Sequence, residues 1–216
     1  MLLPGEKCSV SGLSEKISTK KPLELPVPSA KSSGRRTRNG DIQLLTPTGQ
    51  RFGGVAASQT AVKYDLLQLR NMFSCYQKVA DQNDIQASVI AALASRVSGG
   101  GARLYHTNGY VYGHKAYGIL QCHLETSGLP CEFCPWNSCC HIQMMVSMLL
   151  MPYIKQVQSK HPTWTKEMAL QGGVAAYNFG VKNVQTWGGL DRGSANDDFS
   201  NDVMARAQYL YSLGWN

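Results

Sequence analysis

The sequence predicts an α+β fold that is predominantly α-helical, with a small β-sheet or hairpin region between helices. The chain has 216 residues, of which 43% are hydrophobic and 16% charged, which fits one globular domain with a sizeable core. Apolar residues recur at helical spacing through most of the chain after residue 53. Residues 103–122 instead alternate aromatic and polar side chains around three glycines, a pattern typical of short strands and turns.

The N-terminal segment, residues 1–52, differs from the rest of the chain. It is rich in proline, serine and lysine and carries a net charge of +5, against +2 for residues 53–216. This composition favours a disordered or extended basic segment in front of a folded domain at 53–216. The basic run at residues 34–40 fits either a nucleic-acid or membrane-surface patch or a solvated linker. The linker is the simpler interpretation, and no nucleic-acid partner is expected.

Two helices are predicted at the start of the folded domain. Ser58 can cap the first, whose apolar residues recur at helical spacing over residues 62–73. Asp84 can cap the second, which covers residues 85–97. That segment is apolar on nearly all sides, as expected of a helix at the centre of a core, and the glycines at 99–101 end it.

The second half of the domain is predicted to be mostly helical as well. Residues 141–160 form a long helix that Pro152 would bend or split. Thr163 can cap the next helix, another follows Gly173, and residues 202–213 form the last. The sequence has no run of 18 or more apolar residues, so no membrane span is expected.

Cysteine usage predicts a disulfide framework. Five of the seven cysteines fall within residues 122–140, and such clustering in a small domain is typical of an oxidising compartment. Five cysteines cannot all pair among themselves, so one is expected to reach Cys75 or Cys8 or to stay free. The candidates for pairing are Cys75, Cys122, Cys131, Cys134, Cys139 and Cys140.

A zinc site is the alternative use of the same cluster. It would combine Cys131 and Cys134 with further ligands drawn from Cys139, Cys140, His123 and His141. The chain lacks a second Cys-x2-Cys pair of the spacing that such sites use, so no metal is expected. No other cofactor is expected either.

Three blocks of sequence resemble one family. They are Ser-Arg-Val-Ser at residues 95–98, Tyr-Gly-Ile-Leu-Gln at 117–121, and Gly-Gly-Val-Ala-Ala-Tyr-Asn-Phe-Gly at 172–180. In this order they resemble the goose-type lysozymes, muramidases that cleave the β-1,4 bond between N-acetylmuramic acid and N-acetylglucosamine in peptidoglycan. The resemblance covers about residues 53–216 and implies a lysozyme-like fold.

The surroundings of the cysteines resemble the mollusc members of that family in particular. These are Ser-Gly-Leu-Pro-Cys at 127–131, Cys-Cys-His at 139–141, His-Pro-Thr-Trp at 161–164, and Gln-Thr-Trp-Gly-Gly-Leu-Asp-Arg-Gly at 185–193. The resemblance and the cysteine cluster together imply secretion, although the first residues contain no apolar run of the length that a secretion signal needs. A monomer is expected.

The resemblance also implies that the catalytic centre is altered. In goose-type lysozymes the first block ends Ser-Arg-Glu-Ser and its glutamate is the catalytic acid, whereas Val97 occupies that position here. Two aspartates that orient the attacking water in the family fall at Tyr112 and His123. Residues 85–124 contain neither aspartate nor glutamate. Because valine has no proton to donate, the protein is expected to bind peptidoglycan but to hydrolyse it poorly or not at all.

Two rival hypotheses stay open. An active muramidase in antibacterial defence would need another acid, of which Glu125 is the fallback candidate; an exposed loop charge is the other interpretation of that residue. His123 could also donate a proton, since imidazole titrates near neutrality. Alternatively, the domain is a non-enzymatic interaction scaffold. A peptidoglycan-binding protein would suit bacterial recognition or immune modulation.

Candidate sugar-binding residues are better preserved. Tyr177 and Asn178 match family residues that line the saccharide cleft, and Gln121 is expected to face them. Tyr117 could stack on a sugar ring. Phenol and amide groups suit sugars because they offer oriented donors and acceptors beside an apolar face. Packing is the alternative role for these residues, and the acidic residues within 197–202 resemble a family segment that orders the last helix.

Overall fold

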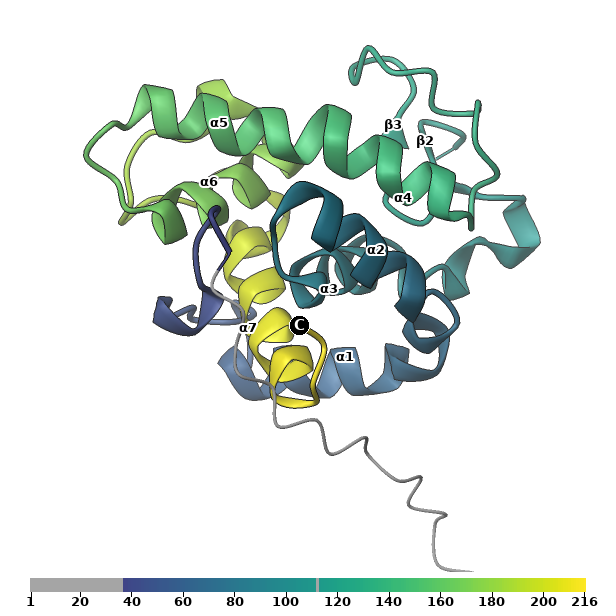
Figure 1. Ribbon diagram of the computed structural model, residues 1–216, viewed down its shortest axis with the longest axis horizontal. Coiled ribbons are helices and arrows are strands. Elements are labelled where there is room, and N and C mark those ends of the chain that lie inside the picture. The colour runs from purple at the N-terminus through teal and green to yellow at the C-terminus, as the bar shows by residue number, and fades with distance from the viewer. Residues whose placement is uncertain (1–36, 112) are drawn as a thin grey trace, which may run out of the picture.

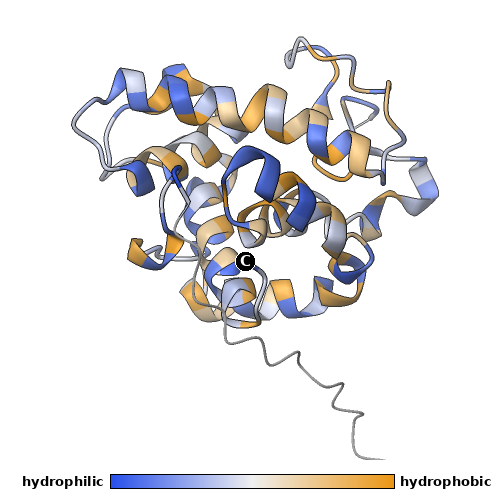
Figure 2. Cartoon of the chain, in the orientation of Figure 1, coloured by the Kyte–Doolittle hydropathy of each residue, from blue (hydrophilic) through white to orange (hydrophobic). Residues whose placement is uncertain are grey.

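The chain folds around one central helix, α3 (Ala87–Ser98). The computed structural model of the protein describes residues 37–111 and 113–216. All but two of the twelve residues of α3 are buried, as its continuous apolar sequence predicted. Helices α1 (Gly54–Arg70), α2 (Phe73–Asn83) and α7 (Phe199–Ser212) pack directly against it (Figure 1). Figure 2 shows that α2, in front of α3, turns a hydrophilic face to the viewer.

The other elements surround this central group. The predicted fold class is confirmed, because the described chain is mostly helical and its antiparallel sheet lies between helices. No helix within the described part of the chain is long and apolar enough to span a membrane. In chain order the remaining elements are η1 (Ile42–Leu44), η2 (Ala102–Thr107), β1 (Tyr110–Val111), β2 (Ala116–Tyr117), β3 (Cys122–His123), α4 (Cys139–Met145), η3 (Val146–Leu150), α5 (Met151–Lys160), α6 (Lys166–Phe179), η4 (Val181–Asn183) and η5 (Ala195–Asp197).

The small sheet sorts its side chains onto two faces. Its strands lie in the order β1-β2-β3, and β2 pairs with β3 so that Ala116 is opposite His123 and Tyr117 is opposite Cys122. Successive residues of a strand point to opposite sides of a sheet. Ala116 and His123 therefore share one face, and Tyr117 and Cys122 share the other.

The long helix predicted at 141–160 is continuous but irregular. It runs from α4 through α5, and Val146–Leu150 forms a π-helical turn in which the Met151 N–H bonds the Val146 carbonyl, five residues earlier. Pro152 follows at the start of α5. Proline lacks an N–H and its ring crowds the preceding turn, which a wider turn can accommodate. The helix is thus neither split nor sharply broken at Pro152 (Figure 1).

The two helices predicted on either side of Gly173 are in fact one. α6 passes through Gly172 and Gly173 without interruption, and its N-cap is Thr165 instead of Thr163. Glycine inside a helix costs about 1 kcal/mol relative to alanine. Here close packing requires it, because a Cβ on Gly173 would lie 2.4 Å from Cγ1 and 2.8 Å from Cα of Ile154 on α5.

Residues 37–52 pack on the folded body, which therefore begins before the predicted boundary at residue 53. Ile42 is fully buried and Leu45 is nearly so. The Gln208 side-chain amide on α7 donates to the carbonyls of both, at 2.7 and 2.9 Å. The prediction for residues 1–36 concerns a part of the chain outside the described residues.

Ser58 and Asp84 hold this N-terminal segment instead of capping helices. α1 begins earlier, at Gly54, and the buried Ser58 hydroxyl accepts a hydrogen bond from the Gln50 N–H at 3.0 Å. Asp84 follows the end of α2 in a left-handed conformation and accepts the Arg38 N–H at 3.0 Å. Both predicted caps were therefore wrong: the Ser58 hydroxyl bonds the backbone of Gln50, 8 residues earlier, and the Asp84 carboxylate bonds that of Arg38, 46 residues earlier.

Three disulfides confirm the predicted framework. They join Cys75 to Cys139, Cys122 to Cys131, and Cys134 to Cys140. Cys75 thus pairs with a cysteine of the 122–140 cluster, one of the outcomes that the sequence predicted. Cys8 is not among the described residues. This pairing uses every thiol of the cluster, so the zinc site considered as an alternative has no cysteine ligand left.

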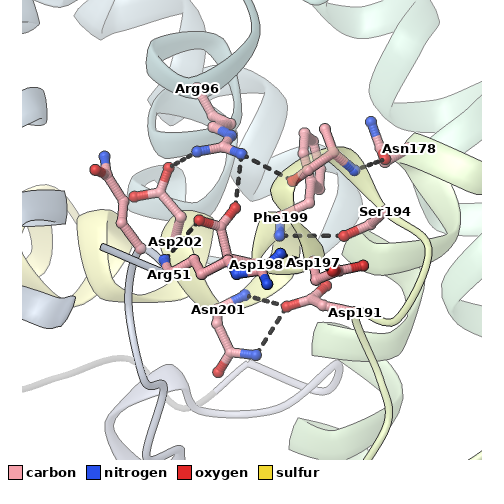
Figure 3. A network of polar contacts seen from close by, with 12 residues as sticks. Arg51, Arg96, Asn178, Asp191, Ser194, Asp197, Asp198, Phe199, Asn201 and Asp202 are labelled. Atoms are coloured by element: carbon pink, nitrogen blue, oxygen red, sulfur yellow. Dashed lines mark hydrogen bonds and ion pairs between the residues drawn. The ribbon is translucent and has the colours of Figure 1, made fainter. Parts of the chain in front are cut away.

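A buried ion-pair network joins the end of α3 to the start of α7. Arg96 donates to Asp202 at 2.6 Å and to Asp198 at 2.8 Å (Figure 3). Arg206, one turn along α7, also pairs with Asp202, at 2.9 Å. The structural role predicted for the acidic residues near 200 is therefore confirmed for Asp198 and Asp202. The same contacts fix the backbone around Val97.

The disulfides are expected to differ in their effect on stability. Replacing Cys75 and Cys139 together by serine should lower the free energy of unfolding by about 4 kcal/mol, because their sequence separation is 64 residues. Replacing Cys134 and Cys140, separated by 6 residues, should lower it by about 2 kcal/mol. Urea unfolding followed by circular dichroism measures both values. Equal losses would contradict the argument from loop length.

The ion-pair network predicts an acid-sensitive part of the stability. Burial alone would raise the pKa of the Asp202 carboxyl, but the hydrogen bonds and charge of Arg206, with help from Arg96, lower it below its ordinary value. A carboxylate with a lowered pKa in the folded state contributes stability above its unfolded-state pKa. That contribution is lost as the pH falls through the folded-state pKa.

Asp202→Asn is therefore expected to cost about 3–5 kcal/mol at neutral pH, because it leaves two buried arginines without their shared partner. The variant should also lose less further stability than the wild type as the pH falls below about 4, near the ordinary pKa of aspartate. Urea midpoints between neutral and acidic pH give both quantities. Glu125→Gln, at an exposed carboxylate, is the control and should follow the wild type.

Candidate functional site

A groove lies beside the end of α3. It consists of two hollows of about 420 and 460 Å³. Four residues line both hollows and make them one continuous surface: Gln121, His123, Tyr177 and Asn178. The first hollow includes Val97, and the second continues toward α5 and α6. The structure thus brings Val97, His123 and three of the four predicted sugar-binding residues together.

No carboxylate lines this groove among the described residues. Beyond the four shared residues, the first hollow is lined by Arg96, Val97, Arg103, Ala116, Ala195, Asn196, Phe199 and Arg206. The second is lined by Thr126, Ser127, Leu149, Tyr153, Ala176, Phe179 and Gly180. Val97 is half-buried at the end of α3. Tyr112, the other position that the resemblance singled out, lies outside the described residues.

Arginines of the groove wall pair with two buried carboxylates, Asp198 and Asp202. Asp198 and Asp202 are both buried and paired with Arg96 (Figure 3). Arg206 adds a second pair to Asp202. A general acid needs a raised pKa so that it holds its proton near neutral pH. The pKa of Asp202 is lowered instead. Asp202 is therefore unsuited to replace a catalytic glutamate.

The two fallback acids lie in different places. Glu125 is exposed in the turn after β3 and does not line the groove. His123 lines both hollows from β3, and its Nδ1 is buried without a hydrogen-bond partner among the described residues. Of the two, only His123 is positioned to meet a ligand in the groove.

A tight turn positions Gln121. Gly118 must be glycine, because its φ is +82° and a Cβ there would lie 2.1 Å from Cε1 of His141. The Gln121 side-chain amide donates to the Gly118 carbonyl at 2.7 Å, which fixes the side chain across the turn. Its Oε1 is buried and has no hydrogen-bond partner among the described residues. Gln121 is therefore a fixed part of the groove wall.

Tyr177 and Asn178 combine structural and surface roles. The Tyr177 hydroxyl donates to the Leu120 carbonyl at 2.6 Å, while the residue lines both hollows. Burial raises the pKa of this hydroxyl well above its ordinary value, so it stays a donor. The exposed Asn178 accepts the Ala195 N–H at 2.9 Å through Oδ1, and no described residue hydrogen-bonds its Nδ2. The packing alternative thus holds for the Tyr177 hydroxyl, and Asn178 keeps a free donor.

Tyr117 does not lie in the groove, contrary to the prediction that it stacks on sugar. It is buried on the opposite face of β2, with its ring 4.9 Å from Tyr110 and 5.9 Å from His141. Ala116, the preceding residue, lines the groove in its place. The alternation of side chains along a strand explains the difference, since only one of two neighbours can face each side.

Arg103 and Asn196 are polar groove residues that the sequence analysis missed. Arg103 is exposed at the edge of the first hollow and forms no ion pair with another described residue. Asn196 reaches the groove from the loop before α7, in a left-handed conformation with φ of 63°. Neither residue belongs to a block that resembled the family, so the sequence carried no signal for them.

Comparisons with known proteins agree with this architecture. The chain is 46% identical over 190 residues to a "Glycine, glutamate and proline-rich protein" of Lottia gigantea, which covers 82% of the chain but only 45% of that protein. The chain thus spans about half the length of that relative. It is 33% identical over 179 residues to lysozyme g of Gallus gallus, covering 83% of the chain and 82% of the relative.

It is also 33% identical over 194 residues to lysozyme g of Struthio camelus, covering 85% of the chain and 92% of that protein. The family model described as "Lysozyme g" matches residues 37–214, which include both the N-terminal segment packed on α7 and the whole groove. The chain therefore belongs to the lysozyme g family.

Proposed function

We propose that this protein binds the glycan strand of peptidoglycan in the groove and hydrolyses it far more slowly than a muramidase with an intact acid. One observation carries the proposal: among the described residues, no carboxylate lines the groove, and Val97 occupies the place where the family resemblance expects the acid. We infer the peptidoglycan ligand from membership of the family, and the low activity from the residues that line the groove.

The chemistry of the reaction explains why the lining matters. Cleavage of a glycosidic bond generally needs a carboxylic acid that protonates the leaving oxygen. Arginine keeps its proton at any physiological pH, and valine and amide side chains cannot donate one to a leaving group. Loss of general acid catalysis lowers a rate by about 10²- to 10⁴-fold, which corresponds to roughly 3–5 kcal/mol in the barrier.

Binding groups suited to a sugar are present. Asn178 offers an amide donor at the surface, Gln121 a side chain fixed in the wall, and Tyr177 an aromatic ring beside them. A hydrogen bond between such a donor and a sugar hydroxyl contributes about 0.5–1.5 kcal/mol. Oriented polar groups beside an apolar surface are the usual composition of a small-molecule site.

His123 supports a second candidate function, a slow muramidase. Its imidazole lines both hollows, and an imidazole can donate a proton near neutral pH. Glu125 supports this alternative less well, because it is exposed outside the groove. We place either activity outside the cell, since three disulfides and the lysozyme family both favour secretion. Recognition of bacteria by a monomer is the role we propose there.

Val97→Glu is expected to raise the rate of wall lysis at least about 100-fold over the wild type, because it returns a carboxylic acid to the end of α3. Clearing of a turbid suspension of Gram-positive cell walls measures the rate. Val97→Gln is the matched control. Glutamine has nearly the same shape as glutamate but no acidic proton, so the rate of this variant should stay at the wild-type level. If the wild type itself clears walls as fast as an active family member, the proposed loss of activity is wrong.

Binding should be detectable without catalysis. We expect the wild type to sediment with insoluble peptidoglycan, and Gln121→Ala to raise its dissociation constant about tenfold, because the side chain that forms part of the wall of both hollows is lost. Thr60→Ala, at an exposed position on α1, is the control for non-specific effects. A wild type that stays in the supernatant would overturn the proposed binding and favour the interaction scaffold.

A further inference from the structure

We infer a second saccharide-binding site, on the opposite side of the 187–198 loop from the groove. There a hollow of about 470 Å³ has none of its lining residues in common with the groove. Its volume falls in the range of about 300–1,000 Å³ typical of small-molecule sites. It is lined by Thr46, Thr48, Gln171, Trp187, Gly188, Gly189, Leu190, Asp191, Arg192, Asp197 and Asn201.

Trp187 supplies a fixed and partly uncovered aromatic ring. It is 39% exposed, and its ring meets Trp164 edge-on with the centroids 5.7 Å apart. Trp164 is itself stacked on His161 at 4.0 Å, so the indole is held from behind. Gly188 follows, and a Cβ there would meet nothing within 4 Å, so the backbone next to Trp187 borders open space. An immobilised ring next to open space suits the apolar face of a sugar.

A fixed carboxylate and free polar groups surround that ring. Asp191 is nearly buried, and its two oxygens accept the Ser200 N–H at 2.8 Å, the Asn201 N–H at 2.9 Å and the Asn201 side-chain amide at 2.8 Å (Figure 3). The carboxylate is thus positioned before any ligand arrives. The side chains that no described residue hydrogen-bonds are those of Thr46, Thr48 and Arg192. They leave hydroxyl and guanidinium groups available to sugar hydroxyls.

The charges of this hollow favour an uncharged saccharide. Asp191, Asp197 and Arg192 all line the hollow, and Asp197 is paired with Arg51 at 3.0 Å. Two carboxylates and two guanidinium groups thus lie at this site, and the local charge is close to balanced. A polyanion would gain little there from electrostatic attraction. The ligand that fits is a neutral amino-sugar chain of the N-acetylglucosamine type.

Such a site would provide attachment that does not depend on the groove. Two sites on one polymer raise the effective affinity without any new contact at either site, provided that both can be occupied together. This inference goes beyond the proposed function, because it assigns glycan binding to residues on the other side of the loop. The second site could bind glycan even if the groove bound none.

Titration calorimetry of the full-length protein with the N-acetylglucosamine tetramer tests the inference. We expect a binding event that Trp187→Ala weakens at least about tenfold, as for an aromatic residue at the centre of a binding site. Trp187→Phe, which keeps an aromatic ring, should retain most of the affinity. Tyr64→Ala removes a ring that is 83% exposed on α1 and should bind as the wild type does.

A second variant separates loss of binding from loss of folding. Arg192→Ala removes an exposed side chain and should weaken the same event, with an unchanged circular dichroism spectrum. If Trp187→Ala and Arg192→Ala both bind the tetramer as the wild type does, the second site does not exist. Tighter binding of an acidic oligosaccharide, such as the galacturonic acid tetramer, at this site would overturn the assignment to a neutral sugar.

The groove and the second site are distinguished by Gln121→Ala. That variant should remove only the binding that belongs to the groove and leave the event that depends on Trp187. If the wild type shows the Trp187-dependent event alone, the proposed groove function fails while the second site stands. If the wild type shows only an event that depends on Gln121, the proposed groove function stands and the second site fails.

Discussion

The pairing of Arg96 with Asp198 and Asp202 is the contact on which the arrangement of the groove depends. It joins the last turn of the central helix to the first turn of the C-terminal helix, over about a hundred residues of sequence. Because the charges are buried, each needs its partner, and the two helices can hardly shift apart. Val97 and the loop with Asn196 meet at the groove for that reason.

The scaffold holds α3 in place without a carboxylate at position 97. α3 is held by apolar packing along its length, by its ion pairs, and by the Ser98 hydroxyl, which donates to the Ile119 carbonyl at 2.7 Å. The side chain at position 97 takes part in the apolar packing but in neither of these polar contacts. A valine fits there because its side chain is half-buried against the core. The polar contacts that hold this part of the fold thus come from Arg96 and Ser98, the neighbours of Val97 in sequence.

Much of the fold could be predicted because its signals are local. The unbroken apolar sequence of α3 and the clustered cysteines pointed directly to a core helix and a disulfide framework. The errors arose where a distant contact decides the outcome. Gly173 resembles a helix end in sequence, but it lies inside α6 because Ile154 of another helix needs the space. Ser58 was assigned to a helix start, whereas its partner is the backbone of Gln50. The same holds for the site. The resemblance located Val97, Gln121 and Tyr177 in the groove. The tertiary structure alone determines that Tyr117 points away from the groove and that Arg103 lies at its edge.

The π-helical turn at Val146–Leu150 has a consequence for the phase of the long helix. Each residue of an α-helix advances the side-chain direction by about 100°, so one additional residue in a turn rotates everything that follows relative to everything before it. The segment before the turn buries Met145 in the core, while Leu149 and Tyr153, within and after it, line the groove. One continuous helix contributes side chains both to the core and to the wall of the groove. The irregular turn thus changes the direction of the side chains that follow it. It does so inside a helix that contributes to both the interior of the protein and the wall of its groove.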